Sequence, residues 1–185
     1  MTKRGMDWLS AAADDPDKCR ARWEDDLRSP QTFSTGRHFD VVVIDQRIGV
    51  ETFDQLQRWV MPTGAVIVDT RAKQVGFFLA SGSRDRFERA LAREAADGTM
   101  PAYKYLELGS CVVVPGPMPL ASDRYQWLNP PGRLAEAFPL RVIALAVLLV
   151  ASARLVERVD RYGERYPTAE AAIAEEAAEA HADAG

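Results

Sequence analysis

Three acidic residues of this chain stand at or near the ends of apolar runs, where they could hold a divalent metal ion. Asp45 ends FDVVVID, Asp69 lies near the end of GAVIVDT, and Glu107 lies in YKYLEL. Two carboxylates at positions i and i+2 of a strand point the same way and can share Mg²⁺ or Mn²⁺. Arg47 follows Asp45 at that spacing, and a cation so close favours an ion pair over a metal.

Each acid also has a structural interpretation. A single carboxylate such as Asp45 binds Mg²⁺ only together with substrate phosphates, and otherwise it ends a strand or pairs with Arg47. Asp69 precedes a short polar segment and is typical of an acid that enters a turn. The sequence leaves both interpretations open for Asp45, Asp69 and Glu107.

The elements that must position these acids follow from apolar patterning. FDVVVID has four consecutive β-branched residues and predicts a central, buried strand over Phe39–Asp45. The runs GAVIVDT and VGFFLA, joined by a short polar segment, predict a hairpin beside that strand. A helix is expected over Val50–Met61, where the apolar residues share one face, and Pro62 ends it.

Further elements complete the expected order. Asp15-Pro16 starts a charged helix that contains Trp23, and Ser83 starts the helix SRDRFERALAREAAD. YKYLEL and SCVVVPG predict a second hairpin, QTFSTGRH a polar connection, and RYQWL a short extended piece. Leu134–Tyr162 is expected to be one long helix, apolar in its first half and charged in its second. This order predicts an α+β fold with a mixed or antiparallel sheet and packed helices, mainly on one face.

Length and composition indicate one globular domain. The chain has 185 residues, is 47% hydrophobic and 27% charged, and carries a net charge of −4, a composition unlike that of disordered chains. We expect a single domain over residues 1–165 and an acidic, flexible or helical tail over 166–185, which contains no Lys or Arg. With two cysteines, no signal-peptide pattern and no apolar run long enough to cross a bilayer, a cytoplasmic protein is expected.

Several short motifs occur in an order that resembles a known family. They are Asp15-Pro16, Trp23, Thr35-Gly36, Asp45, Thr70, Glu107, Pro115, Tyr125 and Trp127. Over about Asp14 to Pro131 the chain is similar to the N-terminal domain of bifunctional DNA primase/polymerases, the prim-pol domains of the archaeo-eukaryotic primase superfamily. It most resembles the short, stand-alone prim-pol-like proteins of actinobacteria. The resemblance implies an α+β primase-polymerase fold.

The resemblance also implies an active site that this chain keeps only in part. Asp45 matches the first acid of the family motif, but Arg47 occupies the place of the second. Glu107 occupies the place of the third acid, usually an aspartate, and Gly76 falls where the family has a histidine that contacts nucleotide phosphates. The expected catalytic remnants are therefore Asp45 and Glu107, and a metal ion would use these two with Asp69.

Three functions remain as alternatives. The first is a non-catalytic or weakly catalytic prim-pol-like module that binds DNA, a nucleotide or a protein partner without a cofactor. The second is an active small DNA primase/polymerase that uses Mg²⁺ or Mn²⁺. The third is a structural module that pairs with a protein partner or a second copy through the long C-terminal helix. The departures at Arg47 and Gly76 favour the first.

Basic residues give weaker signals. Lys73 and Lys104, together with arginines on the helix that follows Ser83, could face a nucleic-acid backbone. The acids interleaved among those arginines are more typical of a solvated helix face. The same interpretation applies to the arginines of the long helix, which lie beside acids: Arg154, Arg158, Arg161 and Arg165.

Overall fold

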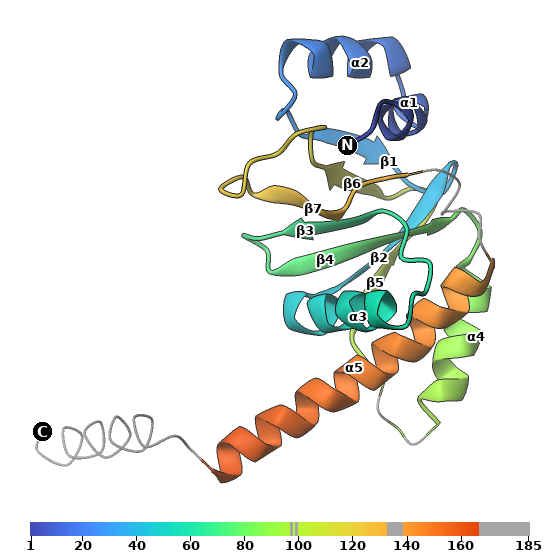
Figure 1. Cartoon of the computed structure of the whole chain (residues 1–185). Coiled ribbons are helices and arrows are strands. Elements are labelled where there is room, and N and C mark those ends of the chain that lie inside the picture. The colour runs from blue at the N-terminus through green and yellow to red at the C-terminus, as the bar shows by residue number, and fades with distance from the viewer. Residues whose placement is uncertain (97, 99, 133–138, 167–185) are drawn as a thin grey trace, which may run out of the picture.

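An antiparallel sheet of five strands, in the order β5-β2-β4-β3-β7, forms the centre of the molecule (Figure 1). The structure, a computed structural model, describes residues 1–96, 98, 100–132 and 139–166. The strands of this sheet are β2 (Phe39–Asp45), β3 (Val66–Asp69), β4 (Gln74–Ala80), β5 (Tyr103–Leu106) and β7 (Tyr125–Asn129). A second, two-stranded sheet pairs β1 (Gln31–Ser34) with β6 (Cys111–Val114), and the helices are α1 (Lys3–Ala11), α2 (Pro16–Asp25), α3 (Gln46–Arg58), α4 (Arg84–Glu94) and α5 (Pro139–Arg165).

The strand β2 is buried on both faces of the sheet, as its β-branched run predicts. Val42 and Ile44 belong to the apolar cluster formed with α3, α4 and α5, whereas Val41 belongs to a second cluster formed with α1, α2 and the small sheet. Successive side chains of a strand point to opposite faces, so one run of residues contributes to two apolar cores.

The predicted α+β class is confirmed. Three helices cover one face, and the small sheet with two helices covers the other (Figure 1).

Of the two strands of the hairpin that was predicted beside β2, only one is a direct neighbour of β2. Its partner on one side is β4, the second strand of the predicted hairpin, and its partner on the other side is β5. The second predicted hairpin is wrong, because β5 joins the large sheet while β6 pairs with β1. The segment QTFSTGRH, expected as a polar connection, contains β1, and α1 was not expected at all.

The helix α4 begins after Ser83 as expected, but the Ser83 side chain does not cap it. The Ser83 amide instead donates to the buried Asp40 carboxylate at 3.3 Å. The Tyr105 hydroxyl donates to the same oxygen of Asp40 at 2.9 Å. Burial and this nearby carboxylate raise the pKa of Tyr105 well above its usual range, which keeps the hydroxyl protonated as a donor. Asp40 therefore joins β2, β5 and α4.

The long helix α5 has the two halves that the sequence predicts. Its first half buries Val142, Leu145 and Leu149 against the sheet and its neighbouring helices. From residue 157 onward every described residue of the helix is exposed, and this half projects from the body of the protein (Figure 1). The expected start at Leu134 lies outside the described residues. So does the expected tail over residues 166–185, except for Tyr166, which is exposed. Within the described residues, none of the helices combines the length and apolar character needed to cross a lipid bilayer.

Candidate functional site

The candidate site lies where four strands of the large sheet end side by side. In the strand register Asp45 of β2 faces Gln74 of β4, Gln74 faces Asp69 of β3, and Asp69 faces Tyr125 of β7. Residues that face one another across neighbouring strands point to the same face of a sheet. Asp45, Gln74, Asp69 and Tyr125 therefore form one row across the end of the sheet.

Asp45 combines two structural roles at this end of β2. It is the last residue of the strand and also the N-cap of α3, because its Oδ1 accepts a hydrogen bond from the Arg47 amide at 2.8 Å. The helix thus begins immediately after the strand, four residues before the predicted start at Val50. Arg47 consequently lies in the first turn of α3, and the expected i and i+2 positions on a single strand are not formed.

The Arg47 side chain pairs with α5 and not with Asp45. Its guanidinium donates two hydrogen bonds to Asp160, at 2.7 and 3.2 Å. This pairing raises the pKa of Arg47 and lowers the pKa of Asp160. The expected ion pair between Arg47 and Asp45 is therefore replaced by a link between α3 and α5.

Asp69 is the last residue of β3, directly before the β3–β4 turn, and both of its carboxylate oxygens accept hydrogen bonds. Its carboxylate accepts hydrogen bonds from the Arg124 guanidinium at 2.7 and 2.9 Å and from the amides of Arg71 and Ala72 at 3.1 and 2.9 Å. The hydrogen bond from Arg124 lowers the pKa of Asp69, and the Ala72 and Arg71 amides contribute in the same direction. These contacts fit the turn interpretation of Asp69 rather than the metal interpretation.

The depressed pKa of Asp69 gives a prediction for acid stability. The ion pair should stabilise the fold above the unfolded-state pKa of about 4 and lose its contribution as pH falls through the lower folded-state pKa. Asp69→Asn keeps an oxygen for the two amides but removes the charge, so we expect it to lower the free energy of unfolding by about 1 kcal/mol at neutral pH. Urea titrations over a pH series should show this difference shrinking below about pH 4. A difference that is constant with pH would contradict the assignment.

Glu107 lies at the opposite end of β2 from Asp45. Leu106 faces Val41 in the antiparallel register, so Glu107 is beyond Val41, at least four residues or about 13 Å along the strand from Asp45. Its side chain forms an ion pair with Arg84 of α4, and its backbone carbonyl accepts a hydrogen bond from the Thr35 hydroxyl at 2.7 Å. The structure therefore does not bring Glu107 to Asp45.

Two lysines, and not further acids, lie beside Asp45. Lys104 of β5 faces Val43 in the register, and Lys73 stands in the β3–β4 turn with a positive φ of 53°. Both are exposed, and with Asp45 and Gln74 they line one open groove of about 440 Å³. Within the part of the chain that the structure describes, neither lysine forms an ion pair. The groove therefore holds two cations and one carboxylate.

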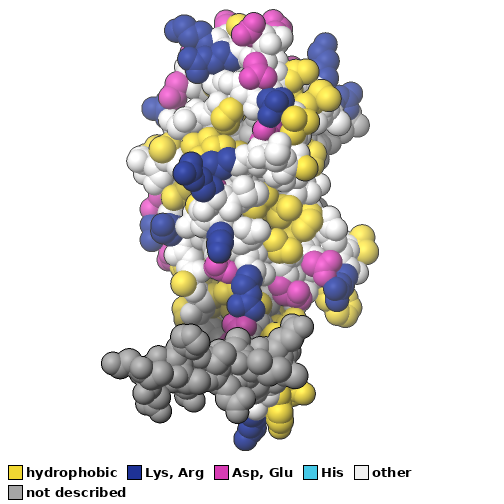
Figure 2. All heavy atoms as spheres, turned by 90° about the vertical axis from the view of Figure 1, so that its left-hand side faces the viewer, with side chains coloured by type: hydrophobic (Ala, Val, Ile, Leu, Met, Phe, Trp, Pro, Cys, Tyr) yellow, Lys and Arg dark blue, Asp and Glu magenta, His cyan; other side chains and the backbone are white. Residues whose placement is uncertain are grey.

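An apolar hollow continues from this groove beneath the small sheet. It measures about 170 Å³ and shares Val43 and Gln74 with the lysine groove. Its walls are mostly aliphatic, with Asp69, Gln74 and Tyr125 supplying its polar and aromatic groups. Figure 2 looks onto this side of the molecule and shows Lys and Arg side chains along the whole length of the face, with acids between them.

Comparison with known proteins decides the family. Residues 2–140 match the family model described as Prim-Pol, bifunctional DNA primase/polymerase, N-terminal. The chain belongs to this family. The match includes α1, which lies before the region of resemblance seen in the sequence, and it ends at the start of α5. No curated protein and no solved structure matches the chain.

Gly76 lines the apolar hollow, at the position where a prim-pol domain is expected to carry its histidine. It faces Val43 and Ile67 in the register. A Cβ atom at this position would lie 3.0 Å from Cγ1 of Ile67 and 3.2 Å from Cγ1 of Val41. A larger side chain would therefore require these neighbours to move, so the surroundings of Gly76 are fitted to glycine.

The residues present do not fit the metal centre that a prim-pol polymerase would require. Within the described ranges no group of three or more His, Cys, Asp or Glu side chains is placed to hold a metal ion. Asp69 is engaged by Arg124, Glu107 lies far along β2, and Asp45 caps a helix.

Sequence reasoning missed the part that Gln74 and the strand register play in this site. Gln74 lies between Asp45 and Asp69 and lines both the groove and the hollow. The alternation in YKYL was a usable signal, because it places Lys104 on the opposite face from Tyr103 and Tyr105. Only the pairing of β5 with β2 places Lys104 near Asp45.

Proposed function

We propose that this prim-pol domain is a non-catalytic module that binds the phosphates of single-stranded nucleic acid in the groove lined by Lys73 and Lys104. One observation carries the proposal: the pairing of β5 with β2 and the β3–β4 turn bring these two lysines to the groove that Asp45 also lines, where the family resemblance leads one to expect further acids. Cations attract phosphates directly, whereas a polymerase site uses carboxylates to hold metal ions that contact the phosphates.

The charges around the groove support binding without a metal. The carboxylates of Asp69 and Glu107 are neutralised by arginines, so they do not oppose a polyanion as free acids would. Asp45 contributes one negative charge beside the two lysines. The local balance therefore favours an anion.

The hollow beneath the small sheet supports a ligand that has apolar flat groups as well as phosphates. Its walls are mostly aliphatic, and Tyr125 lies at its edge, with Cζ of Arg124 4.7 Å from the centroid of the Tyr125 ring. Aromatic and guanidinium surfaces stack on nucleic-acid bases without sequence preference. A strand with its phosphates at the lysines would place bases over this hollow.

The experiment measures the affinity of the full chain for a labelled oligo(dT) by fluorescence anisotropy, in EDTA, over a series of salt concentrations. We expect the double variant Lys73→Ala, Lys104→Ala to bind several-fold more weakly. We also expect the slope of log K against log salt to fall by about 0.7 for each lysine that contacts a phosphate. Competition with dTTP separates two sources of phosphate, since displacement by equimolar dTTP would assign the groove to a nucleotide.

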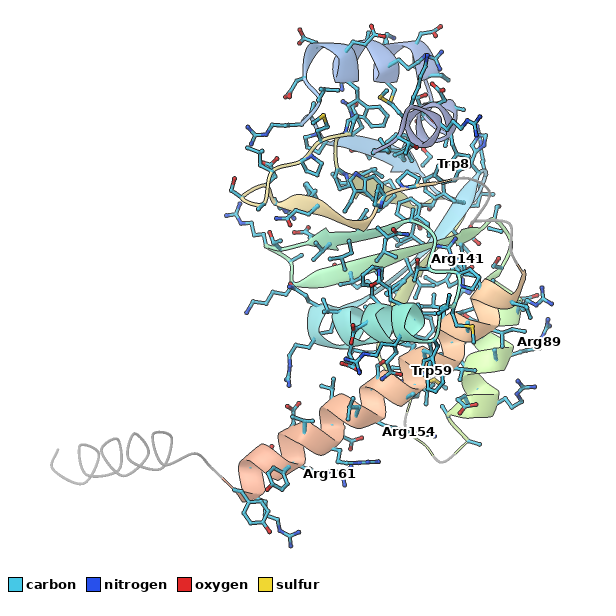
Figure 3. The ribbon with its side chains drawn as sticks, in the orientation of Figure 1. Trp8, Trp59, Arg89, Arg141, Arg154 and Arg161 are labelled. Atoms are coloured by element: carbon cyan, nitrogen blue, oxygen red, sulfur yellow. The ribbon has the colours of Figure 1, made fainter. Side chains whose placement is uncertain are left out.

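A matched control uses two exposed arginines of α4. Arg89 lies on the far side of the molecule from the β3–β4 turn (Figure 3), and Arg86 is exposed on the same helix. The double variant Arg86→Ala, Arg89→Ala removes the same net charge and should leave affinity and salt slope nearly unchanged. Equal losses in both double variants would indicate general charge attraction and contradict binding at the groove.

A further inference from the structure

The projecting half of α5, together with Tyr166 directly after its end, carries an exposed apolar stripe. Leu155, Val159, Tyr162 and Tyr166 have exposed fractions of 39%, 55%, 66% and 59%, and we call these four residues the α5 seam. The rings of Tyr162 and Tyr166 contact each other, with centroids 4.8 Å apart. The seam lies outside residues 2–140, the part of the chain that matches the family.

The spacing of the α5 seam is that of a helix-pairing surface. Its members are separated by four, three and four residues, which is the alternation of a and d positions in a heptad repeat. On a single helix this spacing gives one narrow stripe, the kind that a second helix covers. The adjacent Val156 is half-buried and lines a shallow pocket with Ile48 of α3, so one flank of the seam already meets the body of the protein.

The open flank of the α5 seam is cationic. Arg158 and Arg165 each precede a seam residue and occupy the g positions of the heptad, while Val156 and Gly163 occupy the e positions. Within the described residues Arg158 and Arg165 form no ion pair, and both are exposed. Arg161 projects from the same half of the helix (Figure 3) and is paired with Glu157 at 2.6 Å.

These charges argue against a second copy of the chain as the partner. In an antiparallel pair the g positions face one another, which would place Arg158 against Arg165 of the other copy. In a parallel pair the g positions face e positions, which here are Val156 and Gly163 and offer no opposite charge. Neither arrangement gains an interhelical ion pair, whereas an acidic flank on a partner helix would gain one at each arginine.

We propose that the α5 seam docks an amphipathic helix of a partner protein, whose apolar a and d positions are flanked by Asp or Glu. The apolar stripe supplies the contact area, and the arginines select the charge of the partner helix. None of the four seam residues lines the lysine groove, so we expect the partner helix and the nucleic acid to bind without competing for the same side chains.

The test uses the full chain and two synthetic heptad-repeat peptides that share Leu at a and d but differ at e and g. One peptide carries Glu at those positions, and the matched peptide carries Lys. We expect the Glu peptide to bind at least about tenfold more tightly than the Lys peptide, as two ion pairs gained against two repulsions would produce. Reversing the flank with Arg158→Glu, Arg165→Glu should reverse this preference.

Two further variants separate the seam from general effects. Val159→Glu with Tyr162→Glu places charge on two exposed seam residues, so it should abolish peptide binding and leave the thermal unfolding midpoint unchanged. Met118→Glu changes an exposed apolar residue elsewhere and should leave binding unchanged. Lys73→Ala, Lys104→Ala should also leave peptide binding unchanged, since those lysines serve the other site.

Four outcomes would overturn the proposal. Equal binding of both peptides would show that the arginines select nothing. Binding of neither peptide, also after the tail acids named below are changed to amides, would show that the seam does not dock such a helix. Self-association of the full chain in sedimentation that Val159→Glu, Tyr162→Glu abolishes would assign the seam to a second copy. Glu-peptide binding that appears only after the acids of residues 167–185 are changed to amides would assign it to the chain's own tail. These acids are Glu170, Glu175, Glu176, Glu179 and Asp183.

Discussion

Gly64→Ala is expected to lower the free energy of unfolding by about 2–4 kcal/mol. Gly64 has a φ of +61°, and a Cβ atom there would lie 1.8 Å from Cζ of Arg141. The Arg141 side chain is only 2% exposed, so it has little room to withdraw. It packs beside the segment that joins α3 to β3 (Figure 3). The substitution thus combines an unfavourable backbone conformation with overpacking.

The control for Gly64 is Gly82→Ala. Gly82 also has a positive φ, of +73°, but a Cβ atom there would meet nothing within 4 Å. This variant isolates the backbone cost, which should be about 1 kcal/mol. In the Arg141→Ala background the added cost of Gly64→Ala should fall toward the same value. Urea unfolding of each variant measures these costs, and equal losses for Gly64→Ala and Gly82→Ala would contradict the packing assigned to Arg141.

Leu145→Ala is expected to destabilise the fold by about 2–5 kcal/mol, because it opens a cavity where α5 packs on the sheet. Leu145 is 1% exposed and belongs to the cluster that includes Val42 and Phe77. Val159→Ala removes an apolar side chain from the projecting half of the same helix and should change the free energy of unfolding by less than about 0.5 kcal/mol. Comparable losses in urea unfolding would mean that the projecting half is packed, against the two-part division of α5.

The elements that the sequence predicts best are those set by local signals. Four β-branched residues suffice to mark β2 as a buried strand, and Asp15-Pro16 marks the start of α2, where the Asp15 side chain accepts from the Lys18 amide at 3.0 Å. The strand β1 has no such signal. Its largely polar sequence forms a strand because it pairs with β6, about eighty residues later in the chain. A pairing over that distance cannot be predicted from the local sequence of β1.

The candidate site was harder to predict because its composition depends on strand direction. Asp45, Asp69 and Glu107 each follow an apolar run, and this common pattern suggested a shared site. The antiparallel pairing of β5 with β2 carries Glu107 away from Asp45 and brings Lys104 toward it. The position of Arg47 was also predicted wrongly. Because α3 begins at the residue after Asp45, Arg47 belongs to a helix and not to the strand on which the i and i+2 spacing was expected.

The most direct measurement is the affinity of the full chain for labelled oligo(dT) in EDTA and again in Mn²⁺ or Mg²⁺, with primer extension followed in the same samples. A non-catalytic domain that binds phosphates through lysines should gain no affinity when the metal is added, since divalent cations compete with the lysines for the phosphates, and it should give no extended primer. Primer extension that depends on the metal and is abolished by Asp45→Ala would contradict this function. Such a result would make the protein an active small primase/polymerase.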